Sequence, residues 1–209
     1  MKYLYIDTSS AFLFSAIIED DKVIGEKRIE LGHNLSTNAL YEISTLFEDN
    51  NINVDDINKI IVVDGPGSFT GIRIGITIAK VYAWAKKIPI TTTSALLSMA
   101  LSSKKECIHV PILDARNDFV YAAIYDKDYK ELLNPQHMLK KDLLEELSKY
   151  DNYTFISNDE FNDIDNIEEY VPDFIKIVDF NKNNKDINPH AVNPNYLKMT
   201  KAEESKLND

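Results

Sequence analysis

The fold of this 209-residue chain is decided by the stretch Asp64-Gly-Pro-Gly-Ser-Phe-Thr-Gly-Ile-Arg-Ile-Gly75. This stretch holds four of the six glycines, follows the apolar run 60–63, and opens a long apolar segment that we predict to be a helix over about 68–87. A buried strand, a Gly/Pro turn and a helix in this order are typical of an α/β fold. The same order is found in phosphate-binding loops, because a helix N-terminus attracts anions.

The spacing of the stretch does not match the known phosphate-binding and nucleophile motifs. A Walker loop needs Gly-Lys-Ser/Thr, and the stretch has no lysine before Lys80. The dinucleotide fingerprint needs Gly-x-Gly-x-x-Gly, whereas Gly65 and Gly67 are followed by Gly71, one residue too late. The nucleophile elbow Gly-x-Ser-x-Gly is absent from the stretch as well. A hydrolase that uses its serine or threonine therefore has no positioned base in the sequence.

Small residues recur every four positions along the predicted helix, at Gly67, Gly71, Gly75, Ala79 and Ala83. Each glycine inside a helix costs roughly 0.8–1 kcal/mol relative to alanine. A stripe of small residues lets another backbone approach closely. We therefore predict that the stripe is a helix-packing surface, occupied either by a helix of the same lobe or by a helix of a protein partner.

The remaining surface of this helix is apolar apart from one polar edge. Arg73, Thr77 and Lys80 form that edge and place the arginine beside an interface carboxylate or phosphate. The free amides near Ser68 and Phe69 remain an alternative site for an anion.

The rest of the chain predicts a mixed α/β protein with two related lobes, residues 1–102 and 103–209, separated by the polar run 102–106. In the first lobe we expect strands at 3–6, 12–18, 23–31 and 60–63, a helix over 36–49 capped by Ser36, and a helix over 94–102. In the second lobe we expect strands at 109–113, 119–125, 153–156 and 174–178, a helix over 141–150, and a loop over 181–195.

Composition excludes several classes of function. The net charge is −11, and residues 150–175 carry eight carboxylates without a Lys or Arg, so the chain alone is a poor ligand for RNA. The single Cys107 and four widely spaced histidines indicate neither a disulfide framework nor a metal site, and fit a reducing cytoplasm. Apolar runs stay well below the ~18 residues of a membrane helix, and we expect no secretory signal.

Three segments together resemble one protein family: Ile6-Asp-Thr-Ser9, the stretch 64–75 with Ala79-Lys80, and Pro194-Asn-Tyr-Leu-Lys198. They are similar to the TsaB (YeaZ) family of bacterial tRNA threonylcarbamoyladenosine (t6A) biosynthesis. The resemblance implies a two-lobed actin/hexokinase-like fold (ASKHA, ribonuclease H-like) with mixed sheets flanked by helices. In that fold Asp7, Thr8 and Ser9 occupy the first phosphate loop, here without glycine. They form either a vestigial nucleotide site or a structural turn.

The resemblance also implies a function without catalysis. Such a subunit forms a heterodimer with the related catalytic protein TsaD, is joined by the ATPase TsaE, and forms homodimers in isolation. The complex transfers threonylcarbamoyl from threonylcarbamoyl-adenylate to N6 of adenine 37 in tRNAs that read ANN codons. The subunit contacts tRNA only through the complex and carries no cofactor or metal of its own. TsaD itself carries a His-x-x-x-His metal motif, which this chain lacks. The alternative is a small stand-alone ATPase or kinase of the same fold.

By the same resemblance, the partner interface lies on the helices over about 36–49 and 68–87. Many relatives have His-Ser-Glu before the first helix, where this chain has His33-Asn-Leu. The implied interface residues are His33, Ser36 and Leu40 near the first helix, and Gly67, Ser68, Phe69, Thr70, Gly71, Arg73, Ile74, Gly75, Thr77 and Ile78 on the second.

Overall fold

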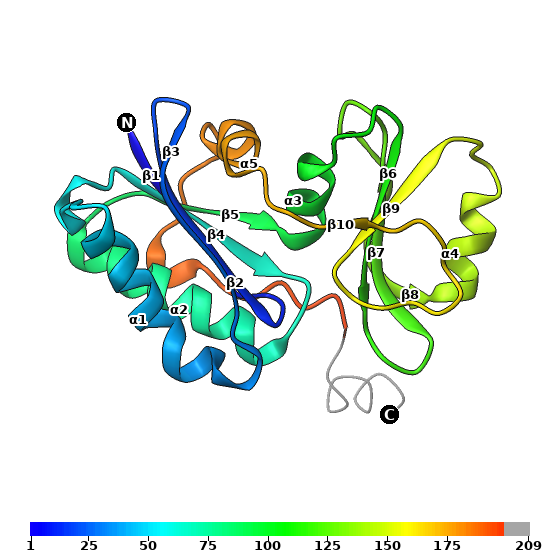
Figure 1. The fold of residues 1–209 in the computed structure, drawn as a ribbon, viewed down its shortest axis with the longest axis horizontal. Helices are drawn as coiled ribbons and strands as arrows, with labels where there is room; N and C mark the ends of the chain where they lie inside the picture. Colours follow the sequence, from blue (N-terminus) through cyan, green and yellow to red (C-terminus); the bar gives the residue numbers. More distant parts are fainter. Residues whose placement is uncertain (199–209) are drawn as a thin grey trace.

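The computed structural model describes residues 1–198 and contains two five-stranded sheets, one in each lobe. Figure 1 shows the two sheets side by side, with helices outside and between them. This arrangement confirms the predicted two-lobed class with mixed sheets flanked by helices. The tail from 199 onward, which we assigned to the second lobe, lies outside the described residues.

The first sheet has the strand order β3-β2-β1-β4-β5. β1 to β3 are antiparallel, and β4 and β5 run parallel to β1. β4 is buried along nearly its whole length, as its apolar run predicts, whereas β3 alternates at the edge of the sheet. The strands are Lys2–Asp7 (β1), Phe12–Glu19 (β2), Lys22–Glu30 (β3), Lys59–Gly65 (β4) and Ile90–Ser94 (β5).

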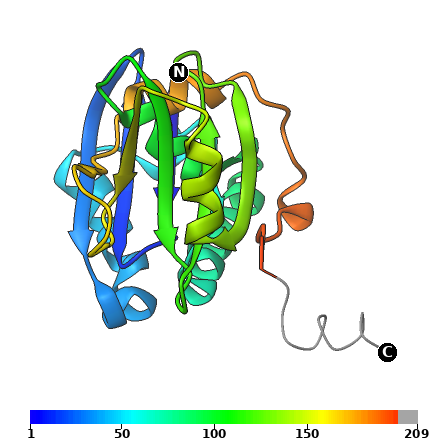
Figure 2. The same cartoon turned by 90° about the vertical axis from the view of Figure 1, so that its right-hand side faces the viewer.

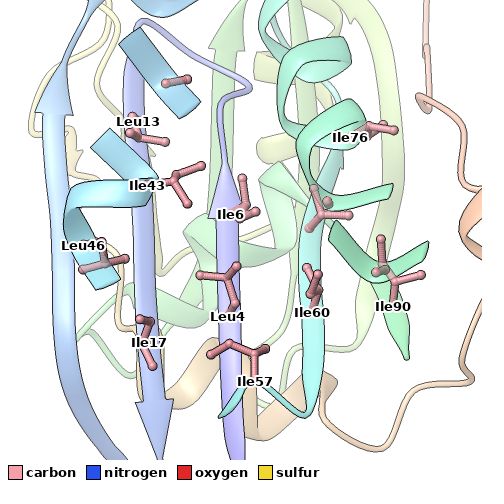
Figure 3. Close-up of a cluster of buried hydrophobic side chains, with 14 of the residues drawn as sticks. Leu4, Ile6, Leu13, Ile17, Ile43, Leu46, Ile57, Ile60, Ile76 and Ile90 are labelled. Carbon is pink, nitrogen blue, oxygen red and sulfur yellow. The ribbon is translucent and has the colours of Figure 1, made fainter. Parts of the chain in front are cut away.

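Helices cover both faces of the first sheet. α1 (Leu35–Asp49) and α2 (Phe69–Lys86) lie on the outer face, where Leu4, Ile6 and Ile60 pack against Ile43 and Ile76 (Figure 3). α3 (Ala95–Ser102) and α5 (Phe174–Asn181) lie on the inner face and share a core with the second sheet. Short 3₁₀ helices occupy Gly32–Asn34, Val54–Asp56 and Pro189–Ala191.

The second sheet repeats the strand pattern of the first, with the order β10-β9-β6-β7-β8 (Figure 2). Three antiparallel strands are followed by α4 and then by strands that run parallel to the first. The elements are Ile108–Asp114 (β6), Phe119–Tyr125 (β7), Glu131–Leu139 (β8), Lys140–Leu147 (α4), Tyr153–Ser157 (β9) and Glu168–Glu169 (β10).

Several predicted elements differ from the structure. The range 174–178 is the start of helix α5, not a strand, because Phe174, Ile177 and Val178 share one buried face and Asp173 accepts the amide of Lys176 as a cap. The helix predicted from Ser36 begins at Leu35, and the exposed Ser36 does not cap it. β5, β8 and β10 were not predicted.

Residues 182–196, the C-terminal strap, return to the first lobe although we assigned them to the second. The buried Lys59 ammonium donates to the carbonyls of Lys182 and Asn184 and pairs with Asp186 at 2.8 Å. Ile187 forms an antiparallel bridge with Ile90 beside β5. The strap then runs along α2 (Figure 1). None of the described helices is long and apolar enough to cross a membrane.

Candidate partner interface and interlobe cavity

The turn between β1 and β2 is a self-contained hydrogen-bonded unit. The Asp7 carboxylate is 2% exposed, and its Oδ1 accepts the Ser9 amide at 2.8 Å and the Ser9 hydroxyl at 2.7 Å. The Tyr5 hydroxyl reaches Oδ2 at 3.5 Å. Burial raises the pKa of Asp7, and no cation within the described chain pairs with it. These bonds are those of an Asx turn, which is the structural-turn interpretation of this segment.

The glycine stripe of α2 packs against this same turn. A Cβ at Gly71 would lie 2.0 Å from the Thr8 carbonyl oxygen, and one at Gly75 would lie 2.4 Å from Thr8 Oγ1. A Cβ at Gly67 would lie 2.2 Å from the Ser9 carbonyl oxygen. The hydroxyl of Thr8 also donates to the Gly71 carbonyl at 2.7 Å. At Gly67, Gly71 and Gly75 the prediction that a helix of a partner or of the same lobe fills the stripe is therefore wrong, because the β1–β2 turn occupies these three positions.

The chain itself engages two of the amides at the start of α2, those of Ser68 and Gly71. The Ser68 amide donates to the Ser9 carbonyl at 2.7 Å, and the Ser68 hydroxyl accepts the Gly71 amide as the helix cap. Ser68 thus joins α2 to the β1–β2 turn, and its amide is not available to a phosphate.

The C-terminal motif completes this junction. The Asn195 amide donates to the Asp64 carbonyl at 2.8 Å, and the Tyr196 ring stacks on Phe69 with 4.6 Å between centroids. Arg73 Nε donates to the Tyr196 hydroxyl at 2.6 Å. The three sequence motifs therefore meet at the carboxyl ends of β1 and β4. The contact between Arg73 and Tyr196 was missed, because the sequence does not show that residues 123 positions apart meet.

The outer surface of α1 and α2 carries several exposed large apolar side chains. The two helices pack on each other through Phe47 and Tyr82, whose ring centroids lie 6.1 Å apart. We define the α1–α2 face by ten exposed or half-buried residues of the two helices: Ser36, Leu40 and Tyr41 on α1, and Thr70, Arg73, Ile74, Thr77, Ile78, Val81 and Trp84 on α2. Leu40, Tyr41, Val81 and Trp84 are 59–65% exposed.

The structure divides the predicted interface residues into two groups. Gly71 and Gly75 are buried and Gly67 is packed on the turn, so the stripe does not belong to the α1–α2 face. Ser68, Phe69 and the remaining predicted residues of α1 and α2 are wholly or partly exposed, and His33 is exposed in the 3₁₀ helix that precedes α1. Tyr41, Val81 and Trp84 were not predicted as interface residues, although their helical positions opposite the buried face could have identified them.

A cavity of about 280 Å³ lies between the two lobes. Asp7, Ser9 and Glu30 line it from the first lobe, and Asp159 and Glu160 line it from the second. Thr8 does not line it, since its side chain is bonded to α2. The described lining residues include no Lys, Arg or His, and no group of three or more His, Cys, Asp or Glu side chains in the described chain could hold a metal ion. The electrostatic potential here repels a nucleotide phosphate.

One further carboxylate, Asp64, is perturbed at the end of β4. Burial raises its pKa to about 6, even though a hydrogen bond with the Thr92 side chain opposes the shift. Asp64 lies beside the junction of the three motifs, since its carbonyl accepts the Asn195 amide.

The repeated strand order and the cavity between the lobes define a two-lobed protein of the actin-like (ASKHA) class. Two solved Pseudomonas aeruginosa structures share this fold: YeaZ, and a protein described as similar to peptidase YEAZ. Their TM-scores are 0.73 and 0.79, each at 17% identity, and each comparison covers 94% of this chain and 99% of the other.

Sequence comparisons show the family. Residues 30–168 match the family model described as TsaD, tRNA N6-adenosine threonylcarbamoyltransferase. TsaB of Bacillus subtilis is 31% identical over 97% of this chain and 96% of its own length. TsaB of Escherichia coli is 32% identical over 61% of this chain and 56% of its own. The chain belongs to the TsaB (YeaZ) family of tRNA threonylcarbamoyladenosine biosynthesis proteins.

Proposed function

We propose that this chain is a non-catalytic subunit that binds a TsaD-like catalytic protein through the α1–α2 face. Its role is to support transfer of threonylcarbamoyl from threonylcarbamoyl-adenylate to N6 of adenine 37 in tRNAs that read ANN codons. A TsaE-like ATPase joins the complex, and tRNA is contacted through the complex. The observation that carries the proposal is the exposed apolar surface of two adjacent helices, with Leu40, Tyr41, Val81 and Trp84 each more than half exposed.

The α1–α2 face has the chemistry of a helix–helix interface. Burying one large apolar side chain contributes about 1.5–3 kcal/mol, and contiguous apolar patches on a monomer mark interaction sites. Aromatic residues such as Tyr41 and Trp84 are enriched among residues that dominate binding energy. Two such helices fit a second pair of helices of the same character. The same face on two copies gives a twofold homodimer when the catalytic partner is absent.

Two features support a role without catalysis. The Asp7 carboxylate is bonded to Ser9, in a turn without the glycines that a phosphate loop needs. The surrounding cavity presents further carboxylates where an ATPase would bind phosphates. The stand-alone ATPase or kinase remains the competing function, and calorimetry of the isolated chain with ATP and Mg²⁺ separates the two. Binding with turnover would favour the enzyme.

The interface is tested by one substitution made in each lobe. Leu40→Glu places a charge on the α1–α2 face, whereas Leu144→Glu places the same charge on the exposed surface of α4, where Leu144 is 39% exposed. We expect Leu40→Glu to abolish co-elution with the TsaD-like protein, because burying an unpaired carboxylate is unfavourable. Leu144→Glu should co-elute as the unmodified chain does, and both variants should keep its thermal unfolding midpoint.

The same two variants then enter a reconstituted tRNA modification assay with the catalytic subunit, the ATPase and threonylcarbamoyl-adenylate. Modification should fall with Leu40→Glu and persist with Leu144→Glu. Full co-elution and modification with Leu40→Glu would contradict the proposed interface. Modification at an undiminished rate without this chain would contradict the proposed role.

A further inference from the structure

The cavity between the lobes has no part in the proposed partner interface, yet it is chemically distinctive. Four carboxylates line it: Asp7 and Glu30 from the first lobe, and Asp159 and Glu160 from the second. Asp159 accepts the Asp114 amide at 2.7 Å, and Glu30 and Glu160 have no ion-pair partner within residues 1–198. Like charges around one cavity repel each other, so a cation between them would be stabilised.

Two nearly buried polar groups in the wall lack adequate partners. The Tyr170 side chain is 7% exposed, and its hydroxyl makes no hydrogen bond of normal geometry in the described chain, although it lies near the Tyr5 hydroxyl. The Asp7 Oδ2 receives only the 3.5 Å contact from Tyr5 and no cation. Leaving such groups unsatisfied costs about 1–3 kcal/mol each. A polar ligand in the cavity would supply the missing partners.

The remaining wall is aromatic and apolar. Phe12 and Tyr170 contribute ring surface, and Ala95, Met99 and Leu113 contribute aliphatic surface. Aromatic faces attract ammonium and guanidinium groups. The cavity volume of about 280 Å³ is close to the lower end of the range for small-molecule sites, about 300–1,000 Å³, and far exceeds the ≈ 30 Å³ that one water occupies.

We propose that this interlobe cavity binds a small organic cation that carries an ammonium or guanidinium group on a short aliphatic chain. The cationic group lies among Asp7, Glu30 and the Tyr170 hydroxyl, and the aliphatic chain packs on Met99 and Leu113. Asp159 and Glu160 approach the ligand from the second lobe, so binding joins the two lobes. An anionic nucleotide meets four carboxylates in the same place and is excluded.

Isothermal titration calorimetry of the isolated chain with agmatine, which has a guanidinium at one end and an ammonium at the other, tests the proposal. We expect saturable binding with one site per chain. 1,4-Butanediol, which has a similar chain without charge, should not bind. Because charge-assisted hydrogen bonds are the strong ones, Asp7→Asn should weaken agmatine binding about tenfold or more. Asp151→Asn, an exposed carboxylate outside the cavity, should leave it unchanged.

Tyr170→Phe keeps the test decisive if Asp7→Asn unfolds the turn. The hydroxyl that it removes makes no hydrogen bond of normal geometry in the described chain and only approaches the Tyr5 hydroxyl, so the variant should nearly keep its unfolding midpoint and still bind agmatine several-fold more weakly. Absence of saturable agmatine binding, or equal affinity in the unmodified chain and Tyr170→Phe, would overturn the proposal. So would agmatine and 1,4-butanediol binding alike. The measurement needs no partner protein, so its outcome is independent of the proposed scaffold function.

Discussion

The two lobes share one strand order. They differ in the segment that follows the strand lying parallel to the central strand, which is β4 in the first lobe and β9 in the second. In the first lobe β4 leads into the 18-residue helix α2, whereas in the second lobe β9 leads into the largely irregular segment 158–167. The turns at equivalent positions differ accordingly. The β1–β2 turn is buried under α2, while the β6–β7 turn exposes Arg116, Asn117 and Asp118 in left-handed conformations.

This difference explains where the sequence motifs lie. A helix that packs directly on a turn has no room for side chains at the contact. This is why positions 71 and 75, which lie beside Thr8, are glycines. The exposed β6–β7 turn imposes no such demand on the second lobe. The same helix that buries the first turn also carries seven of the ten residues of the α1–α2 face, so the structural motif and the proposed interface occupy opposite sides of α2.

The largest expected effect comes from adding a side chain where α2 packs on the β1–β2 turn, the contact that distinguishes the first lobe from the second. Gly71→Ala places a methyl group 2.0 Å from the Thr8 carbonyl oxygen, which is backbone and cannot rotate away. Overpacking a core costs about 1–3 kcal/mol, and we expect the upper end despite the helix propensity of alanine. Urea denaturation measures the loss, and Thr77→Ala on the exposed side of α2 is the control. Equal midpoints for both variants would show that α2 does not need this glycine.

The second effect concerns the end of β4 and depends on pH. The pKa of Asp64 is about 6 in the folded protein and near 3.8 when unfolded, so the unfolded state ionises first and stability falls as the pH rises from about 4 to about 6. Each pKa unit corresponds to about 1.4 kcal/mol, so a difference of just over two units should make Asp64→Asn more stable than the unmodified chain by about 3 kcal/mol near pH 7.5. The difference should vanish near pH 3.5. A pH-independent difference in the free energy of unfolding would exclude this origin.

A smaller effect tests whether the C-terminal strap belongs energetically to the first lobe. Tyr196→Ala removes the stacking on Phe69 and the hydrogen bond from Arg73, and we expect a loss of about 1.5 kcal/mol. Tyr41→Ala removes an exposed ring with no ring contact in the described chain and should cost little in the isolated protein. Equal thermal midpoints for both tyrosine variants would mean that the strap contact adds nothing to folding.

The smallest effect tests the exposed turn of the second lobe. Arg116 has φ of +66°, a conformation that glycine adopts without strain. Arg116→Gly should change the free energy of unfolding by no more than about 0.5 kcal/mol, because the relief of strain is offset by the greater entropy of glycine in the unfolded chain. A loss comparable to that of Gly71→Ala would remove the contrast between the two turns.

The sequence predicted the elements that leave a periodic apolar pattern, such as β4 and α2, and the repeated order of the two lobes. It indicated that some backbone packs on Gly71, but spacing along one helix cannot identify that backbone, and Thr8 lies 63 residues away. Phe174–Val178 was assigned as a strand because five residues of mixed apolar pattern fit both periods. The cavity was not predicted, since its carboxylates come from distant positions in both lobes.

The C-terminal strap also determines which of the two lobes has all its parts first during synthesis. The strands of the second lobe are continuous within 108–169, so this lobe has all its strands on the ribosome before the strap is made. The first lobe must wait longer, because the buried Lys59 ammonium has its acceptors only at residues 182, 184 and 186. The half of the protein that is translated first is therefore the half whose last hydrogen bonds form later.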